Sequence, residues 1–216
     1  MKSIIDEGLI CIFRGIPRDK LVDAAKAVYA GGVRVVEIAF NPADPNTAET
    51  TADYIRTIIN EVPELTVGAG TVVNTNLVKA AYDAGAKFIF SPNVNLNVIK
   101  LTKELGMISI PGALTPSECA AAYDAGADII KLFPITIKDV DYVKGIMRPL
   151  NYIPFICVGG TNENTIEAFF EAGALGVGTG ISILKPELIE AGDYDAITEL
   201  AKIHVTKIRE CQKKYR

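Results

Sequence analysis

The chain alternates short apolar runs with amphipathic helical stretches, and this alternation limits the folds that it can adopt. Eight runs have the length and the β-branched or aromatic content of strands. They cover residues 9–13, 33–40, 65–67, 88–90, 108–110, 129–133, 155–158 and 175–177. Apolar residues at helical spacing occur between them, for example at 20–28, 77–81 and 166–170, and a last helix is expected over 193–216.

The expected helices share one type of ending. A glycine follows five of the helical patterns and precedes an apolar run, at Gly32, Gly85, Gly106, Gly126 and Gly173. Glycine can take the left-handed backbone conformation that closes a helix. Five copies of this ending favour a serial arrangement of strand–helix units.

The fold prediction follows from the number of units. Several strands are apolar at consecutive positions, which is typical of parallel sheets that are buried on both faces. Eight strand–helix units in 216 residues have the size of a (β/α)8 TIM barrel, an α/β fold. A doubly wound open sheet is the alternative, but no GxGxxG motif follows the first strand. No linker divides the chain, so we expect a single domain over residues 1–216.

The composition of the chain argues against some classes of partner and indicates its cellular compartment. The chain is 49% hydrophobic and 22% charged with a net charge of −4, so it is globular and gives no reason to expect nucleic acid or an anionic membrane. No apolar run reaches the ~20 residues that span a bilayer, and the first residues lack an apolar signal region. Its four cysteines form no CxxC pair. We expect a cytoplasmic protein with reduced thiols.

The chain contains one histidine, His204, and this excludes several kinds of active site. Nucleophiles activated by histidine need one near the reacting group, and multi-histidine metal sites need two or three. His204 lies in a late amphipathic stretch, where we expect it on a helix surface. Any acid–base or nucleophilic chemistry must therefore come from carboxylates, lysines, tyrosines or cysteines.

Active sites of such barrels lie at the carboxyl ends of the strands, where few polar residues are available. Lys131 lies in an apolar run, and burial would give it a neutral amine that forms Schiff bases with carbonyl compounds. Equally, its stem could be packed while the amine reaches water. Glu37 also lies in an apolar run, where it could move protons for such a lysine or form a structural ion pair with it. The other polar residues at strand ends are Arg14, Asn41, Thr71, Ser91 and Asn93.

Two glycine clusters follow the last two predicted strands. One is Val158-Gly159-Gly160-Thr161-Asn162 and the other is Gly176-Val177-Gly178-Thr179-Gly180-Ile181-Ser182. Loops at these places form the common phosphate site of TIM barrels, where backbone N–H groups face the anion. A lysine, a glutamate and a phosphate site without metal ligands indicate Schiff-base chemistry on a phosphorylated carbonyl compound, such as aldol cleavage. A barrel that decarboxylates or isomerises without a Schiff base, and a barrel that only senses a phosphorylated acid, are the competing hypotheses.

Eight motifs, in order along the chain, carry a family resemblance. They are Ile12-Phe13-Arg14-Gly15-Ile16, Gly32-Val33-Arg34-Val35-Val36-Glu37-Ile38, Val67-Gly68-Ala69-Gly70-Thr71-Val72, Ser91-Pro92-Asn93, Ile110-Pro111-Gly112, Ile130-Lys131-Leu132-Phe133-Pro134, Val158-Gly159-Gly160 and Gly178-Thr179-Gly180. From about Leu9 to its C-terminus, the chain resembles the 2-keto-3-deoxy-6-phosphogluconate (KDPG) aldolase family, with its 6-phosphogalactonate and 4-hydroxy-2-oxoglutarate aldolase relatives.

The resemblance implies a homotrimeric class I aldolase that needs no metal or cofactor. It implies cleavage of a phosphorylated 2-keto-3-deoxy sugar acid to pyruvate and glyceraldehyde 3-phosphate. Lys131 would form the Schiff base and Glu37 would be the general acid and base. Thr71 and the Ser91-Pro92 corner would line the pyruvate half, and Phe133 would pack against the Schiff base. Arg14 would contact the substrate carboxylate, and the phosphate would be held by Gly159, Gly160 and the loop Gly178-Thr179-Gly180.

Two positions depart from the gluconate-type pattern. Asn41 stands four residues after the glutamate, where an arginine often binds the substrate carboxylate, so Arg14 would supply that charge. Val158 replaces a threonine near the C4 hydroxyl, and valine cannot hydrogen-bond it. We therefore expect weak discrimination between the gluconate and galactonate epimers. Which of Gly180, Ile181 and Ser182 contacts phosphate stays open.

Overall fold

The computed structural model describes residues 1–216, apart from the side chain of Lys2. Its strands are parallel and form one sheet in the order β5-β4-β3-β2-β1-β9-β8-β7-β6. They are β1 (Leu9–Phe13), β2 (Val35–Ala39), β3 (Thr66–Gly70), β4 (Phe88–Phe90), β5 (Ile108–Ile110), β6 (Gly112–Ala113), β7 (Ile130–Ile135), β8 (Phe155–Gly159) and β9 (Gly176–Thr179). The eight predicted strands are all present, and the fold is a TIM barrel as predicted.

The fifth barrel position is occupied by two short strands. Pro111 separates β5 from β6, and proline has no N–H to donate to a neighbouring strand. β5 pairs with β4, whereas β6 pairs with β7. The two ends of the sheet therefore belong to one interrupted strand, and this brings the barrel close to closure.

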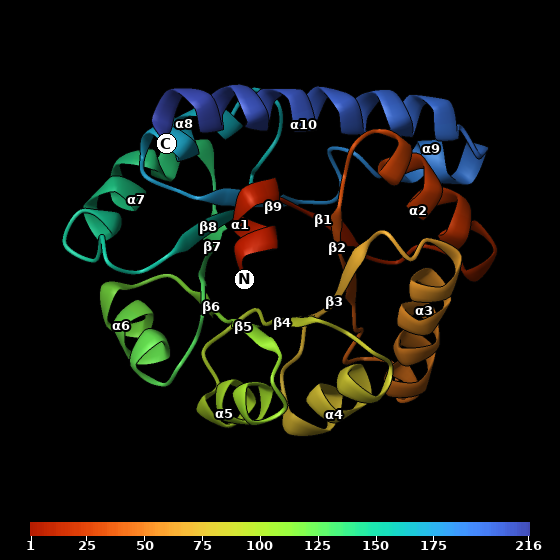
Figure 1. Cartoon of the computed structure of the whole chain (residues 1–216), viewed down its shortest axis with the longest axis horizontal. Coiled ribbons are helices and arrows are strands. Elements are labelled where there is room, and N and C mark those ends of the chain that lie inside the picture. Colours follow the sequence, from red (N-terminus) through yellow and green to blue (C-terminus); the bar gives the residue numbers. More distant parts are fainter.

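Helices surround the sheet in a ring (Figure 1). They are α2 (Leu21–Ala30), α3 (Thr47–Glu61), α4 (Thr75–Asp83), α5 (Leu96–Glu104), α6 (Pro116–Asp124), α7 (Val140–Met147), α8 (Ile166–Glu171), α9 (Pro186–Ala191) and α10 (Tyr194–Tyr215), with short 3-10 turns at Arg18–Lys20 and Ile137–Asp139. The five glycines predicted to close helices all have positive φ, between 73° and 110°. The predicted final helix is α10.

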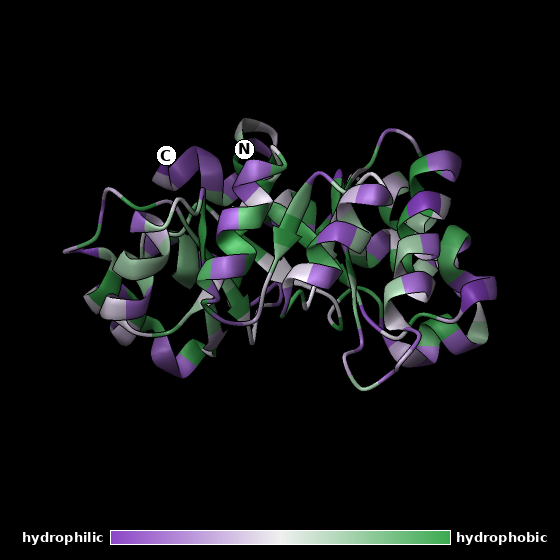
Figure 2. Cartoon of the chain, turned by 90° about the horizontal axis from the view of Figure 1, so that it is seen from below, coloured by the Kyte–Doolittle hydropathy of each residue, from purple (hydrophilic) through white to green (hydrophobic). Residues whose placement is uncertain are grey.

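A helix that the sequence pattern did not predict lies at the amino end of the barrel. Helix α1 (Lys2–Glu7) is in the middle of the ring in Figure 1, and its Ile4 is buried among the side chains that fill the barrel. Gln212 of α10 donates hydrogen bonds to the carbonyls of Ile5 and Asp6. Both chain ends lie on the same side of the barrel in Figure 2.

The apolar core has two layers. One lies between the sheet and the helices, and Figure 2 shows hydrophobic strands inside helices whose outer faces are largely hydrophilic. The other fills the barrel and includes Ile10, Val35, Phe88, Ile129 and Ile156. The polar residues at the carboxyl ends of the strands lie directly above this second layer.

His204 is buried, which corrects the expectation that it lies on a helix surface. It is 0% exposed, and its Nδ1 lies 2.8 Å from the carbonyl oxygen of Leu200 on the preceding turn of α10. The buried residues of α10 recur every three or four positions, and His204 lies in the middle of the face that packs against α2 and α8; these residues are Ile197, Ala201, His204, Ile208 and Cys211. This helical spacing is present in the sequence and already indicates that His204 is buried.

No helix among the described residues has both the length and the apolar character needed to cross a membrane.

Candidate active site

A cavity of about 420 Å³ lies at the carboxyl ends of the strands. Its lining contains every residue for which the family resemblance implies a role, apart from Ser91 and Gly160. The lining residues are Ile12, Arg14, Glu37, Thr71, Pro92, Lys131, Phe133, Val158, Gly159, Gly178, Thr179, Gly180 and Ile181. Residues from opposite sides of the barrel thus meet in one space.

Strand periodicity places Glu37 and Lys131 inside the barrel. Val35 and Ile129 pack in the inner core, and side chains two residues further along a strand point to the same side. Glu37 and Lys131 therefore stand one layer above that core, on β2 and β7. They are 1% and 7% exposed, respectively.

Strand β3 makes room for these side chains by presenting glycines to the interior. A Cβ on Gly70 would collide with the carboxylate of Glu37, and a Cβ on Gly68 would collide with the ring of Phe88. Any larger residue at 70 would therefore displace the carboxylate. The Gly68-Ala69-Gly70 sequence is a spatial requirement of the site.

The amine of Lys131 lies between two aromatic rings. Its Nζ is 4.1 Å from the ring centroid of Phe90 and 4.3 Å from that of Phe133. It forms no salt bridge with any described residue. Burial lowers the pKa of Lys131, the charge of Glu37 raises it, and the guanidinium of Arg14 lowers it. The net direction is downward, which favours a neutral, nucleophilic amine.

The carboxyl group of Glu37 is also perturbed. Burial raises the pKa of Glu37, while the positive charges of Lys131 and Arg14 act in the opposite direction, and the net direction is upward. Its Oε2 has no hydrogen-bond partner among the described residues. A buried carboxyl with a raised pKa and a free oxygen can accept and return protons near neutral pH.

Arg14 and Thr71 form the polar wall of the cavity. Nη2 of Arg14 donates a hydrogen bond of 2.8 Å to Oγ1 of Thr71. Thr71 has φ of 57°, and it is the one non-glycine residue with positive φ in the described part of the chain. Such a backbone costs about 1–2 kcal/mol for a residue with a Cβ. Ser91, which does not line the cavity, donates to the carbonyl of Val72 and supports the turn after Thr71.

The glycine loops after β8 and β9 form the opposite wall. Gly159 has φ of 145°, and a Cβ there would collide with the carbonyl of Ile135, so only glycine fits. Gly160 does not line the cavity, and its N–H donates to the carbonyl of Ile135 at 2.7 Å. Strand β8 and the turn after it are therefore anchored to the end of β7.

Thr161 joins the two loops, although its sequence position did not mark it as a site residue. Its hydroxyl donates to the carbonyl of Gly178 at 2.6 Å. Its own carbonyl accepts hydrogen bonds from the hydroxyls of Thr179 and Ser182, and these two hydroxyls also contact each other. The signal available in the sequence was a threonine directly after the glycine pair.

The remaining strand-end candidates lie elsewhere. Asn41 lines a separate cavity between the end of β2 and helix α3, and its N–H donates to Oγ1 of Thr47. Asn93 is exposed and is not part of the lining. Among the described residues, no group of three or more His, Cys, Asp or Glu side chains is arranged to hold a metal ion.

Comparison with known proteins gives a consistent set of similarities. A family model described as KDPG and KHG aldolase matches residues 4–200. The chain is 35% identical over 182 residues to the KHG/KDPG aldolase of Escherichia coli (strain K12), covering 84% of this chain and 83% of that protein. It is 32% identical over 191 residues to a probable 2-dehydro-3-deoxy-6-phosphogalactonate aldolase of Rhizobium meliloti (strain 1021), covering 88% and 87%. A solved structure described as native KDPGal superposes with a TM-score of 0.84 and 28% identity, covering 95% of this chain and 96% of that one.

Proposed function

The chain belongs to the KDPG and KHG aldolase family, and we propose that it is a class I aldolase acting through Lys131. It cleaves 2-keto-3-deoxy-6-phosphogluconate to pyruvate and glyceraldehyde 3-phosphate. The galactonate epimer and 4-hydroxy-2-oxoglutarate are further candidate substrates. The observation that carries the proposal is the buried amine of Lys131, held between Phe90 and Phe133 and facing the same cavity as Glu37.

The reaction begins at the amine. Because burial lowers the pKa of Lys131, a neutral amine is available to attack the C2 ketone. The resulting carbinolamine loses water and becomes an iminium ion. The iminium then accepts the electron pair of the C3–C4 bond as that bond breaks.

Glu37 moves the protons. Its ionised carboxyl takes the proton of the C4 hydroxyl, so that C4 leaves as the aldehyde carbon and C3 becomes the terminal carbon of an enamine. The protonated carboxyl then returns a proton to C3. Water hydrolyses the iminium to pyruvate and regenerates the amine of Lys131. The raised pKa of Glu37 suits a group that must both accept and donate.

The two walls of the cavity suit the two ends of the substrate. Arg14 and Thr71 would hold the carboxylate of the pyruvate half, with Pro92 lining that half and Phe133 against the Schiff base. Gly159 and the Gly178–Gly180 loop would hold the phosphate. Since Gly160 already donates its N–H to Ile135, we assign it to support of the loop instead of phosphate contact.

The resemblance also supports a homotrimer that works in the cytoplasm, in sugar-acid breakdown of the Entner–Doudoroff type. Light scattering of the purified protein measures its mass in solution, and a monomeric mass would contradict the trimer.

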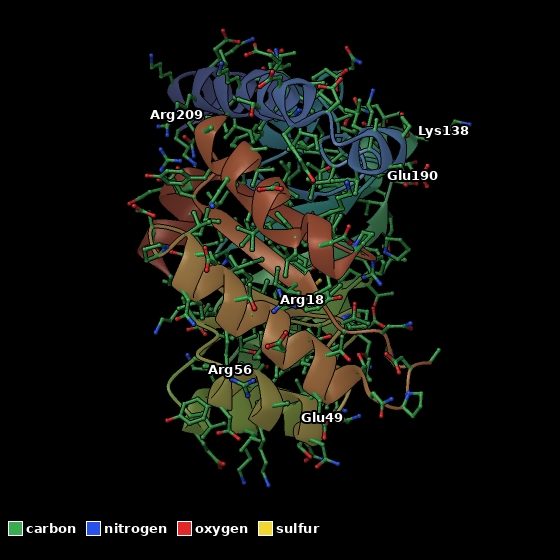
Figure 3. The ribbon with its side chains drawn as sticks, turned by 90° about the vertical axis from the view of Figure 1, so that its right-hand side faces the viewer. Arg18, Glu49, Arg56, Lys138, Glu190 and Arg209 are labelled. Atoms are coloured by element: carbon green, nitrogen blue, oxygen red, sulfur yellow. The ribbon has the colours of Figure 1, made fainter. Side chains whose placement is uncertain are left out.

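Reductive trapping tests the central step. The protein is incubated with pyruvate and borohydride, and the modified residue is located by mass spectrometry. We expect one adduct on Lys131 and loss of both adduct and cleavage in Lys131→Ala. Lys138→Ala is the matched control, because Lys138 follows the same strand and projects from the edge of the molecule (Figure 3). Full activity in Lys131→Ala without an adduct would favour a barrel that works without a Schiff base.

A further inference from the structure

A second aromatic ring lies against the reacting amine, and the reaction described so far gives that ring no role. The ring centroid of Phe90 on β4 is 4.1 Å from Nζ of Lys131, as close as that of Phe133 at 4.3 Å. Phe90 is fully buried and does not line the open cavity, so it faces the amine from within the barrel. The ring therefore contacts the nitrogen without lying in the space that the substrate fills.

The ring of Phe90 is fixed by its neighbours inside the barrel. Phe88 belongs to the inner core and Phe90 lies two residues further along β4, so both rings point to the same side. The two rings pack edge to face, with centroids 6.5 Å apart and an interplanar angle of 86°. The ring of Phe90 extends to β9, where a Cβ on Gly178 would lie 3.4 Å from its Cζ. It is thus held between β4 and β9, next to the nitrogen of Lys131.

The charge on that nitrogen changes during the proposed reaction. The neutral amine adds to the C2 ketone and gives a neutral carbinolamine. The nitrogen lone pair then forms the C=N bond, and the hydroxyl on C2 leaves as water with a proton from the carboxyl of Glu37. The iminium nitrogen is positive until it takes up the electron pair of the C3–C4 bond. A group that stabilises this positive charge therefore favours formation of the iminium.

The surroundings of Nζ suit a cation. Aromatic rings attract a cation that lies over their faces within about 6 Å, and the attraction is stronger where water is excluded. Nζ lies over both rings, well inside this limit. It has no hydrogen bond or salt bridge to another described residue. The described residues thus offer this nitrogen aromatic faces instead of hydrogen-bond acceptors.

Aromatic faces also distinguish the iminium from the ammonium form of the free lysine. Both are cations, but an ammonium has three N–H donors and an iminium has one. Rings are weak hydrogen-bond acceptors, so each buried N–H that faces them costs free energy. The arrangement therefore disfavours the ammonium more than the iminium. The lowered pKa of Lys131, caused mainly by burial, agrees with this.

We propose that Phe90 is a further catalytic residue, which together with Phe133 forms an aromatic pocket that stabilises the positively charged iminium on Lys131. This role rests on the proposed function for the Schiff base itself. It gives β4, a strand whose side chains belong to the inner core, a part in the chemistry.

Fluorination of the ring tests the charge effect while the packing is kept. Fluorine withdraws negative charge from the face of the ring and adds little volume, so phenylalanines with one, two and three ring fluorines are placed at position 90 through an amber codon. The assay is the rate of borohydride trapping of pyruvate on Lys131, because borohydride reduces the iminium. It is measured above the inflection of the pH profile, where the free amine is neutral in every variant.

We expect the trapping rate to fall with each added fluorine, to about a tenth of the wild-type rate with three. The inflection itself should move to lower pH across the series, because the ammonium also loses part of its attraction to the ring. If Phe90 served packing alone, neither the rate nor the inflection would move.

The same three fluorinated residues at position 88 are the matched control. Phe88 is also a fully buried ring of β4, but it makes no cation–π contact with Lys131 in the described structure. The Phe88 series should trap pyruvate at the wild-type rate. An unchanged or higher rate in the Phe90 series, or an equal fall in the Phe88 series, would overturn the role of Phe90 and leave the Schiff base standing. A wild type that traps no pyruvate would refute the proposed function, and the role of Phe90 with it.

Discussion

Glu37→Gln is expected to give a more stable but much less active enzyme. Glu37 is 1% exposed, its Oε2 has no partner among the described residues, and burial raises its pKa above the ordinary 4.5. A carboxyl with a raised folded pKa stabilises the fold fully only at low pH, and that stability is lost as pH rises through the folded pKa. An amide of the same shape does not ionise, so the variant escapes this loss.

The size of the effect follows from the same geometry. An unsatisfied buried polar group costs about 1–3 kcal/mol, and more when charged. Part of that cost is offset in wild type because Glu37 faces the amine of Lys131. We therefore expect Glu37→Gln to gain about 1–2 kcal/mol near pH 8 and little near pH 5. Loss of the proton carrier should lower kcat by about 10²–10⁴-fold, with a much smaller effect on KM.

Urea denaturation at several pH values, together with steady-state kinetics, measures both quantities. Glu49→Gln is the control, because Glu49 is an exposed glutamate on α3 (Figure 3). The reasoning would be refuted if Glu37→Gln were less stable than wild type near pH 8, if the gain did not grow with pH, or if kcat were retained.

Three further predictions concern the same cavity. Gly70→Ala should displace the carboxylate of Glu37 and lower kcat at least tenfold, measured as cleavage rate, while the circular dichroism spectrum stays that of wild type. The rate of pyruvate trapping should fall as the amine of Lys131 is protonated, and its pH profile should have an inflection below pH 10.5, the ordinary pKa of lysine. Glu37→Gln should move this inflection to lower pH and Arg14→Gln should move it to higher pH. Shifts of the opposite sign would contradict the assigned effects of the two charges. Wild type should prefer one C4 epimer by less than about a thousandfold in kcat/KM, and Val158→Thr should sharpen the preference about tenfold.

Much of the fold can be predicted because the two sequence signals that indicate it, hydrophobic periodicity and helix-ending glycines, are local. Strand and helix periods are written in consecutive residues, and the glycine after each helix is fixed by backbone geometry at that residue. The strand-end rule then brings Lys131 and Glu37 into one cavity from runs almost a hundred residues apart. Few other polar residues lie at the strand ends, so most of the residues that line the cavity could be predicted from the sequence.

The structure differs from the sequence predictions mainly where contacts between residues far apart in the chain determine the local structure. Helix α1 has no side-chain cap, and its place depends on Ile4 fitting the amino end of the barrel. His204 is a different case, because it continues the helical spacing of the buried apolar residues of α10, and its burial follows from that pattern. Gly160 has the sequence context of a phosphate ligand, but its N–H is taken by Ile135, a residue of another strand. The contacts of α1 and of Gly160 leave no periodic trace in the sequence.

The helix at the amino end of the barrel also limits where reactant and products can enter and leave the cavity. Ile4 and the side chains above it fill the interior, so the cavity opens toward the loops, where Ile181 at its rim is 75% exposed. Reactant and products therefore pass through the same opening of the cavity. In the proposed reaction pyruvate stays attached to Lys131 until the last hydrolysis, so the three-carbon aldehyde phosphate must leave first. Pyruvate, as the last to leave, should compete with the sugar acid for the empty enzyme, whereas the aldehyde should not.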